Sequence, residues 1–174
     1  MPTYLALLRA VNVSGHNLVP MKELRARMEA AGYTNVRTYI QSGNVIFDHP
    51  STNESELRSA LAELITTEFN AKSPVVLRNR EELAETIANC PFTIDAGEEK
   101  LFHVMFLGNL PNDEQLAALD PNRSPLDKWQ VRGRDIYVHY ASGIAGTKLT
   151  NSYFDSKLKT VSTGRNWRTV NTPL

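Results

Sequence analysis

The order of the elements in the first half of the chain constrains its fold more than any other sequence feature. Short β-rich runs and stretches of helical periodicity alternate as strand, helix, strand, strand, helix, strand. This is the split βαβ pattern of ferredoxin-like folds. The strands are expected at residues 4–8, 36–40, 45–47 and 75–77, and the helices at residues 21–31 and 53–69.

The second half repeats most of this order. After a short helix at residues 81–88, strand and helix patterns recur, with residues 89–100 as the seam between the halves. We therefore expect an α+β chain of two tandem ferredoxin-like subdomains with mainly antiparallel sheets. Residues 1–90 form the first subdomain, and residues 91–174 pack on it to make one compact unit. The later elements are expected at residues 101–107, 112–119, 129–132, 135–140 and 148–158.

The charge balance narrows the classes of partner. The chain carries 19 basic and 19 acidic side chains, whereas proteins dedicated to duplex DNA usually show a basic excess that neutralises phosphates. No apolar run approaches the ~20 residues that cross a bilayer, so we expect no membrane role. The single cysteine, Cys90, and an N-terminus without a leader pattern predict a cytoplasmic location.

Motifs that carry chemistry are sparse. The four histidines are scattered, without the spacing of a metal site, and no phosphate-binding loop, dinucleotide fingerprint or nucleophile elbow is present. We therefore expect no metal and no cofactor. Neither paired carboxylates nor a nucleophile with its base stand out, so the sequence does not decide whether the chain is an enzyme.

The loop at residues 9–19 is the first candidate for a binding site. Arg9 ends a strand, and Asn12 lies on a polar route into the first helix. Val19 has no side-chain oxygen with which to cap that helix, so its first N–H groups can receive a phosphate or a carboxylate. The alternative, weighted equally, is that Asn17 or water satisfies these groups and that Gly15 only permits a turn.

A hairpin turn at residues 41–44 is the second candidate. Gly43 and Asn44 readily adopt the positive φ angles of tight turns, and this role alone accounts for most such segments. Gln41 has no turn-forming reason to be there, and Ser42 adds a hydroxyl. The turn therefore offers polar groups to a ligand as well as a change of chain direction.

The segment at residues 163–169 is the third candidate. Arg165 and Asn166 precede Trp167, and guanidinium and indole groups together can bind anions or stack on flat rings. The alternative is a terminal helix that Thr163 caps and that Trp167 anchors in the core.

Three runs of the sequence stand out together: Leu-Leu-Arg-Ala-Val-Asn-Val-Ser-Gly at residues 7–15, Thr-Tyr-Ile-Gln-Ser-Gly-Asn-Val-Ile-Phe at residues 38–47 and Arg-Asn-Trp at residues 165–167. These runs resemble a known family, the bacterial domain-of-unknown-function family 1697. Departures occur at Ala10 and Ser14, where that family favours glycine, and after Thr169, where it usually has a longer helix. The resemblance implies a duplicated α+β subdomain of ferredoxin-like character, and it implies no function. The recurrent polar positions of the family fall here on Arg9, Asn12, Gln41, Ser42, Asn44, Arg165 and Asn166.

The leading hypothesis is a site for a small anionic ligand, phosphorylated or nucleotide-like. Arg9 and Arg165 would pair the anion, and Ser42 would donate a hydrogen bond with the N–H groups of the first helix. The amides of Asn12, Gln41, Asn44 and Asn166 would complete the site.

Two other hypotheses come from different classes of function. An RNA-binding module could use Tyr137 and Tyr140 as a stacking surface on strands, although the neutral charge argues against it. A structural or partner-binding protein would use the polar clusters only to cap turns. The sequence does not determine the oligomeric state.

Overall fold

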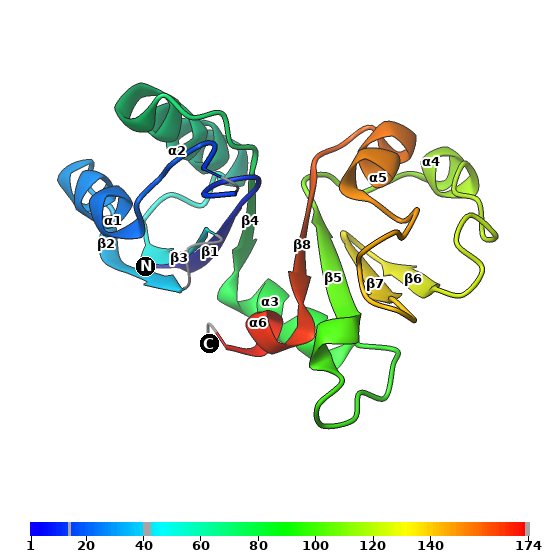
Figure 1. The fold of residues 1–174 in the computed structure, drawn as a ribbon. Coiled ribbons are helices and arrows are strands. Elements are labelled where there is room, and N and C mark those ends of the chain that lie inside the picture. Colours follow the sequence, from blue (N-terminus) through cyan, green and yellow to red (C-terminus); the bar gives the residue numbers. More distant parts are fainter. Residues whose placement is uncertain (14, 40–42, 173–174) are drawn as a thin grey trace. The chain divides into compact units, whose positions relative to one another are not determined.

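The computed structural model describes residues 1–13, 15–39 and 43–172. These residues form eight strands, six α-helices and one short 3-10 helix (Figure 1). Their contacts divide the chain into two compact units, Met1–Leu83 and Ala84–Thr172. The division falls within a helix, a little before residue 90, and the expected subdomain boundary stays a prediction.

The first unit contains one four-stranded antiparallel sheet with the order β2-β3-β1-β4. Because β1 and β2 both run antiparallel to β3, they are parallel to each other with β3 between them, which is a split βαβ arrangement. The elements are β1 (Thr3–Leu8), α1 (Met21–Ala30), β2 (Thr34–Tyr39), β3 (Asn44–Asp48), α2 (Glu54–Phe69) and β4 (Val75–Asn79).

Both helices of the first unit pack on one face of its sheet (Figure 1). Apolar side chains at helical spacing, such as Leu24 and Met28 of α1 and Leu61 of α2, meet Ala6 and Phe47 of the sheet in one buried cluster. α2 begins where the side chain of its N-cap residue, Asn53, accepts a hydrogen bond from the Glu56 N–H. The predicted helices and hairpin strands of this half are confirmed.

The second unit repeats the arrangement of the first. Its sheet has the order β6-β7-β5-β8, again antiparallel throughout. α5 contributes to one buried cluster with this sheet, and the partly buried Leu116 of α4 packs against that cluster. The elements are α3 (Arg80–Ala88), which links the units, then η1 (Glu99–Leu101), β5 (Phe102–Leu107), α4 (Asp113–Ala117), β6 (Lys128–Arg132), β7 (Asp135–His139), α5 (Asn151–Leu158), β8 (Ser162–Asn166) and α6 (Trp167–Asn171).

The segment from Ser162 to Asn166 is a strand, so a terminal helix capped by Thr163 is wrong. This segment, β8, is hydrogen-bonded along β5 and completes the second sheet. The helix begins only at Trp167, and Asn166 caps it by accepting from the Thr169 N–H at 2.9 Å. Pairing with β5 satisfies the backbone N–H and C=O groups of this segment. Helix signals, which lie within a few residues of one another, do not reveal such a pairing.

The α+β class with two antiparallel sheets is confirmed. Within the described ranges, no helix is long and apolar enough to cross a membrane. The cytoplasmic location stays a prediction.

Candidate functional site

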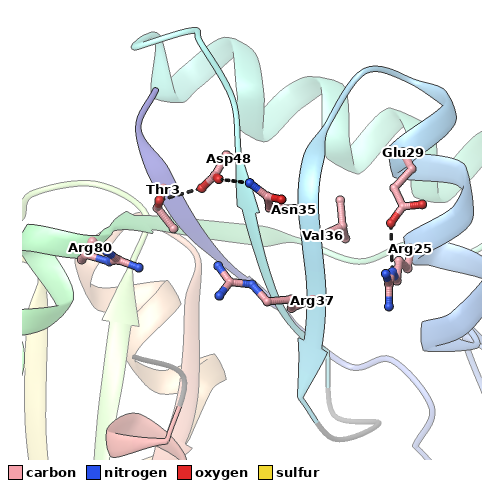
Figure 2. Close-up of a pocket in the computed structure, with 8 residues that line it drawn as sticks. All are labelled: Thr3, Arg25, Glu29, Asn35, Val36, Arg37, Asp48 and Arg80. Atoms are coloured by element: carbon pink, nitrogen blue, oxygen red, sulfur yellow. Dashed lines mark hydrogen bonds and ion pairs between the residues drawn. The ribbon is translucent and has the colours of Figure 1, made fainter.

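A polar cavity of about 580 Å³ lies in the first unit, and we call it the arginine pocket (Figure 2). Residues of α1, of the three strands β1, β2 and β3, and of the start of α3 surround it. It is lined by Thr3, Arg25, Glu29, Asn35, Val36, Arg37, Asp48 and Arg80.

The carboxylate of Asp48 is the fixed anion of the arginine pocket. Thr3 lies opposite Asp48 in the sheet, and its Oγ1 donates to Asp48 Oδ1 at 2.6 Å. Asn35 Nδ2 donates to the second carboxylate oxygen, Oδ2, at 2.6 Å. These hydrogen bonds, first that of Asn35, together with the charges of Arg37 and Arg80, hold the pKa of Asp48 below its usual range. Asp48 is therefore ionised at neutral pH.

An irregularity in β2 brings Asn35 to Asp48. The pairing of β2 with β3 shifts register between Thr34 and Arg37, and Asn35 has a left-handed φ of 51°. Asparagine tolerates this conformation better than most residues, so the sequence suits the bulge. The alternation of the strand then places Arg37 in the same pocket.

Three arginines line the same pocket as this carboxylate. Arg25 is paired with Glu29 one helical turn away, with 2.9 Å between Nε and Oε1. Figure 2 shows Arg37 and Arg80 extending toward one another, with the Arg25–Glu29 pair on the other side of β2. In the described part of the chain, Arg37 and Arg80 make neither a hydrogen bond nor an ion pair, and both are exposed.

The start of α3 positions Arg80. Asn79 and Glu82 form a capping box, in which Asn79 Oδ1 accepts from the Glu82 N–H at 2.8 Å and the Asn79 N–H donates to Glu82 Oε2 at 2.9 Å. Arg80 is the first residue of this helix and follows directly after β4.

The arginine pocket has an excess of positive charge. Three guanidinium groups face two carboxylates, those of Glu29 and Asp48, which leaves one net positive charge. Guanidinium groups present planar pairs of donors that match phosphate and carboxylate oxygens. The pocket can therefore bind an anion between Arg37 and Arg80.

The loop candidates Arg9 and Asn12 lie in the first unit, outside the arginine pocket. The Arg9 N–H donates to Ser73 Oγ, and Ser73 Oγ donates back to the Arg9 carbonyl at 2.9 Å. The amide of Asn12 bridges the loop, because its Nδ2 donates to the Val19 carbonyl and its Oδ1 accepts from the Val19 N–H at 2.8 Å. The Asn12 side chain thus closes the loop. A contact between Asn12 and a ligand stays a prediction.

The start of α1 has no side-chain cap, as expected from Val19. Asn17 does not take this role, because its Nδ2 donates instead to the carbonyls of Ala10 and Lys72. Within the first turn, only the acidic side chain of Glu23 complements the helix dipole.

Of the three candidate residues in the hairpin, only Asn44 lies within the described part of the chain. Gln41 and Ser42 lie outside the described residues. Asn44 belongs to β3, has no exposed surface, and donates from Nδ2 to the Tyr39 carbonyl at 3.0 Å across the hairpin. Its side chain therefore holds the hairpin, and a contact with a ligand stays a prediction.

The remaining candidates, Arg165 and Asn166, lie in the second unit. Arg165 is buried on β8, and its Nη1 donates to Thr163 Oγ1 and to the Gly164 carbonyl at 2.9 Å. Desolvation lowers the pKa of Arg165 to about 10, which leaves it charged at neutral pH. Asn166 caps α6. Because Arg9 and Arg165 belong to different units, their union in one site stays a prediction.

The tyrosines expected to stack on RNA are buried. Tyr137 and Tyr140 are 2% and 1% exposed, and their hydroxyls donate to the carbonyls of Thr86 and Leu149. Neither ring offers a face to a base.

The arginine pocket was not identified from the sequence, although part of its signal is present there. In the run Asn35-Val36-Arg37, polar side chains flank an apolar one, as in a strand with one polar face. Nothing local in the sequence joins these residues to Asp48 or Arg80, because strand register and the start of α3 bring them together.

We predict that Asn12→Ala lowers the free energy of unfolding by about 2 kcal/mol, because the buried Val19 backbone loses two hydrogen bonds. Asn70→Ala is the matched control, since Asn70 has a similar φ of 50° and its side chain makes no hydrogen bond to the described residues. Urea denaturation followed by circular dichroism measures both. Equal losses in the two variants would show that the backbone angle, rather than the bridge to Val19, matters.

The comparisons with known proteins agree with the fold. A solved structure of a conserved bacterial protein, SP0830 from Streptococcus pneumoniae, matches with a TM-score of 0.69 and 22% identity, over 98% of this chain and 95% of that one. Among curated proteins, none matches. The family described as a protein of unknown function, DUF1697, matches residues 1–137, which is most of the chain. The chain therefore belongs to the DUF1697 family.

Proposed function

We propose that this protein binds a small anionic ligand, phosphorylated or nucleotide-like, in the arginine pocket. The observation that carries the proposal is the pair Arg37 and Arg80, which line one cavity and make no ion pair within the described residues. An anion between them would receive charge-assisted hydrogen bonds from two forked donors.

Asp48 adds a second requirement for the ligand. Each of its carboxylate oxygens accepts one hydrogen bond, from Thr3 and Asn35, and has capacity for a further donor. A ligand that carries hydroxyl groups beside its phosphate would satisfy both Asp48 and the arginines. Sugar phosphates and nucleoside monophosphates have this combination.

Calorimetric titration at low ionic strength tests the proposal with inorganic phosphate, glucose 6-phosphate and adenosine monophosphate as probes. We predict that Arg37→Gln and Arg80→Gln each weaken binding about tenfold, the loss of roughly 1.4 kcal/mol. Both side chains are exposed, so the variants should fold normally. Arg27→Gln is the matched control, because Arg27 is an exposed arginine of α1 outside the pocket.

Other outcomes would decide against this site. Phosphate probes that bind equally to the wild type and to both pocket variants would place the anion elsewhere, with Arg9 and Arg165 the next positions to substitute. Failure of all three probes to bind at millimolar concentration would reject a small-anion function. Binding of short RNA alone, with an affinity that falls steeply as salt rises, would favour the RNA-binding alternative.

A further inference from the structure

A second cavity of the first unit, of about 340 Å³, differs in chemistry from the arginine pocket. We call it the tyrosine pocket. The segment just after α1, the loop after β3 and residues 56–64 of α2 surround it. It is lined by Ala31, Tyr33, His49, Ser51, Glu56, Leu57, Ala60 and Leu64.

Tyr33 is the buried polar group of the tyrosine pocket. Its side chain is 6% exposed, and its ring packs edge-on against Phe47 and at a tilt against His49. Its hydroxyl makes no hydrogen bond with any described residue. The hydroxyl is not among the fully enclosed unpartnered polar atoms of the described residues, so it is accessible from the cavity and available to a ligand there.

The other polar side chains of the tyrosine pocket differ in the hydrogen-bonding groups and charge that remain for a ligand. His49 Nδ1 accepts from the Ser51 N–H at 3.1 Å, and Ser51 Oγ accepts from the Asn53 N–H. Glu56 is exposed, and within the described residues its carboxylate has neither an ion pair nor a hydrogen bond. The lining of the pocket therefore contains one uncompensated carboxylate as well as the Tyr33 hydroxyl.

The rest of the wall is apolar. Leu57, Ala60 and Leu64 lie along α2, and Ala31 faces them from the end of α1. A ligand must therefore combine an apolar body with a group that satisfies an acceptor carboxylate. A second anion does not meet this requirement, because Glu56 would repel it.

We propose that the tyrosine pocket binds a small organic cation, a primary ammonium attached to an aromatic or aliphatic body. The ammonium group donates to the Glu56 carboxylate and to the Tyr33 hydroxyl oxygen, and the body packs against Leu57 and Leu64. The adjacent rings of Tyr33 and His49 add an attractive surface for the cation. Burial raises the pKa of Tyr33, so its hydroxyl stays protonated and can also donate. This site shares no residue with the arginine pocket, so either can fail independently.

The probes are phenethylamine, its neutral analogue 2-phenylethanol and its anionic analogue 3-phenylpropionate, titrated into the ¹⁵N-labelled full chain. We expect saturable shifts of the Ala60 and Leu64 amide signals with phenethylamine, and weaker effects with the neutral and anionic probes. Glu56→Gln should weaken binding of the amine about fivefold, in line with a partly exposed ion pair. Tyr33→Phe keeps the ring and removes the hydroxyl, and should weaken binding about threefold.

Glu63→Gln is the matched control, because Glu63 is an exposed carboxylate of the same helix outside the pocket. It should leave the affinity for phenethylamine unchanged. The proposal is overturned if phenethylamine does not bind saturably, if it binds no better than 2-phenylethanol, or if Glu56→Gln and Glu63→Gln have equal effects. Amide spectra of each variant without ligand show that it is folded, so a loss of binding reports on the pocket.

Discussion

Gly43→Ala should lower the free energy of unfolding by about 4 kcal/mol, the largest loss we expect from a single methyl group in this chain. Gly43 has a φ of +90°, which favours glycine. A Cβ there would lie 2.7 Å from Leu8 Cβ and 2.8 Å from Val11 Cγ2. Leu8 and Val11 are 1% and 2% exposed, so neither has space in which to move.

Gly32→Ala separates the backbone effect from the steric clash. Gly32 also has a positive φ, of +100°, but a Cβ there meets nothing within 4 Å. We expect this control to lose only about 1 kcal/mol. Both tryptophans, Trp129 and Trp167, lie in the second unit, so denaturation should be followed by circular dichroism. Similar losses in the two variants would mean that the contacts of Gly43 with Leu8 and Val11 do not matter.

The second unit should lose about 3 kcal/mol of stability between pH 6.5 and pH 4 through His103. Burial lowers the pKa of His103 from 6.5 to about 4. Its Nδ1 is buried without a hydrogen-bond partner, and its ring packs edge-on against Tyr140. Below pH 6.5 the unfolded chain takes up a proton that the folded chain does not bind until about pH 4, so acid favours unfolding.

His103→Phe tests this pH dependence, because phenylalanine keeps a ring against Tyr140 and cannot titrate. We expect the variant to lose less stability than the wild type as the pH falls from 6.5 to 4, measured by tryptophan fluorescence in urea. Substitution of the exposed His16 by glutamine should leave the wild-type dependence in place. A His103→Phe profile parallel to that of the wild type would contradict the assignment.

Most helices and strands were predictable because their signals are local. Apolar side chains at helical spacing and caps such as Asn53 and Asn79 lie within a few residues of the elements that they define. β8 was missed because Ser162–Asn166 has no strong strand pattern and becomes a strand by pairing with β5. The first half of the chain ends on a strand, and this order of elements is the signal from which β8 could have been predicted.

The candidate site was less predictable than the fold. The polar residues that stand out along the chain largely serve the backbone, since Asn12 closes a loop, Asn44 holds a hairpin and Asn166 caps a helix. The arginines of the pocket are unremarkable in the sequence. Arg37 lies in a strand and Arg80 begins a helix, and no local sequence pattern marks either as a ligand-binding residue.

The sequence by itself determined the α+β class and most of the alternating elements of each half, because these depend on interactions between near neighbours. Only the tertiary structure decided that Thr3, Asn35 and Asp48 form one hydrogen-bonded group beside Arg37 and Arg80. That arrangement depends on the register of β1 with β3 and on the bulge in β2, which set contacts between residues far apart in the chain.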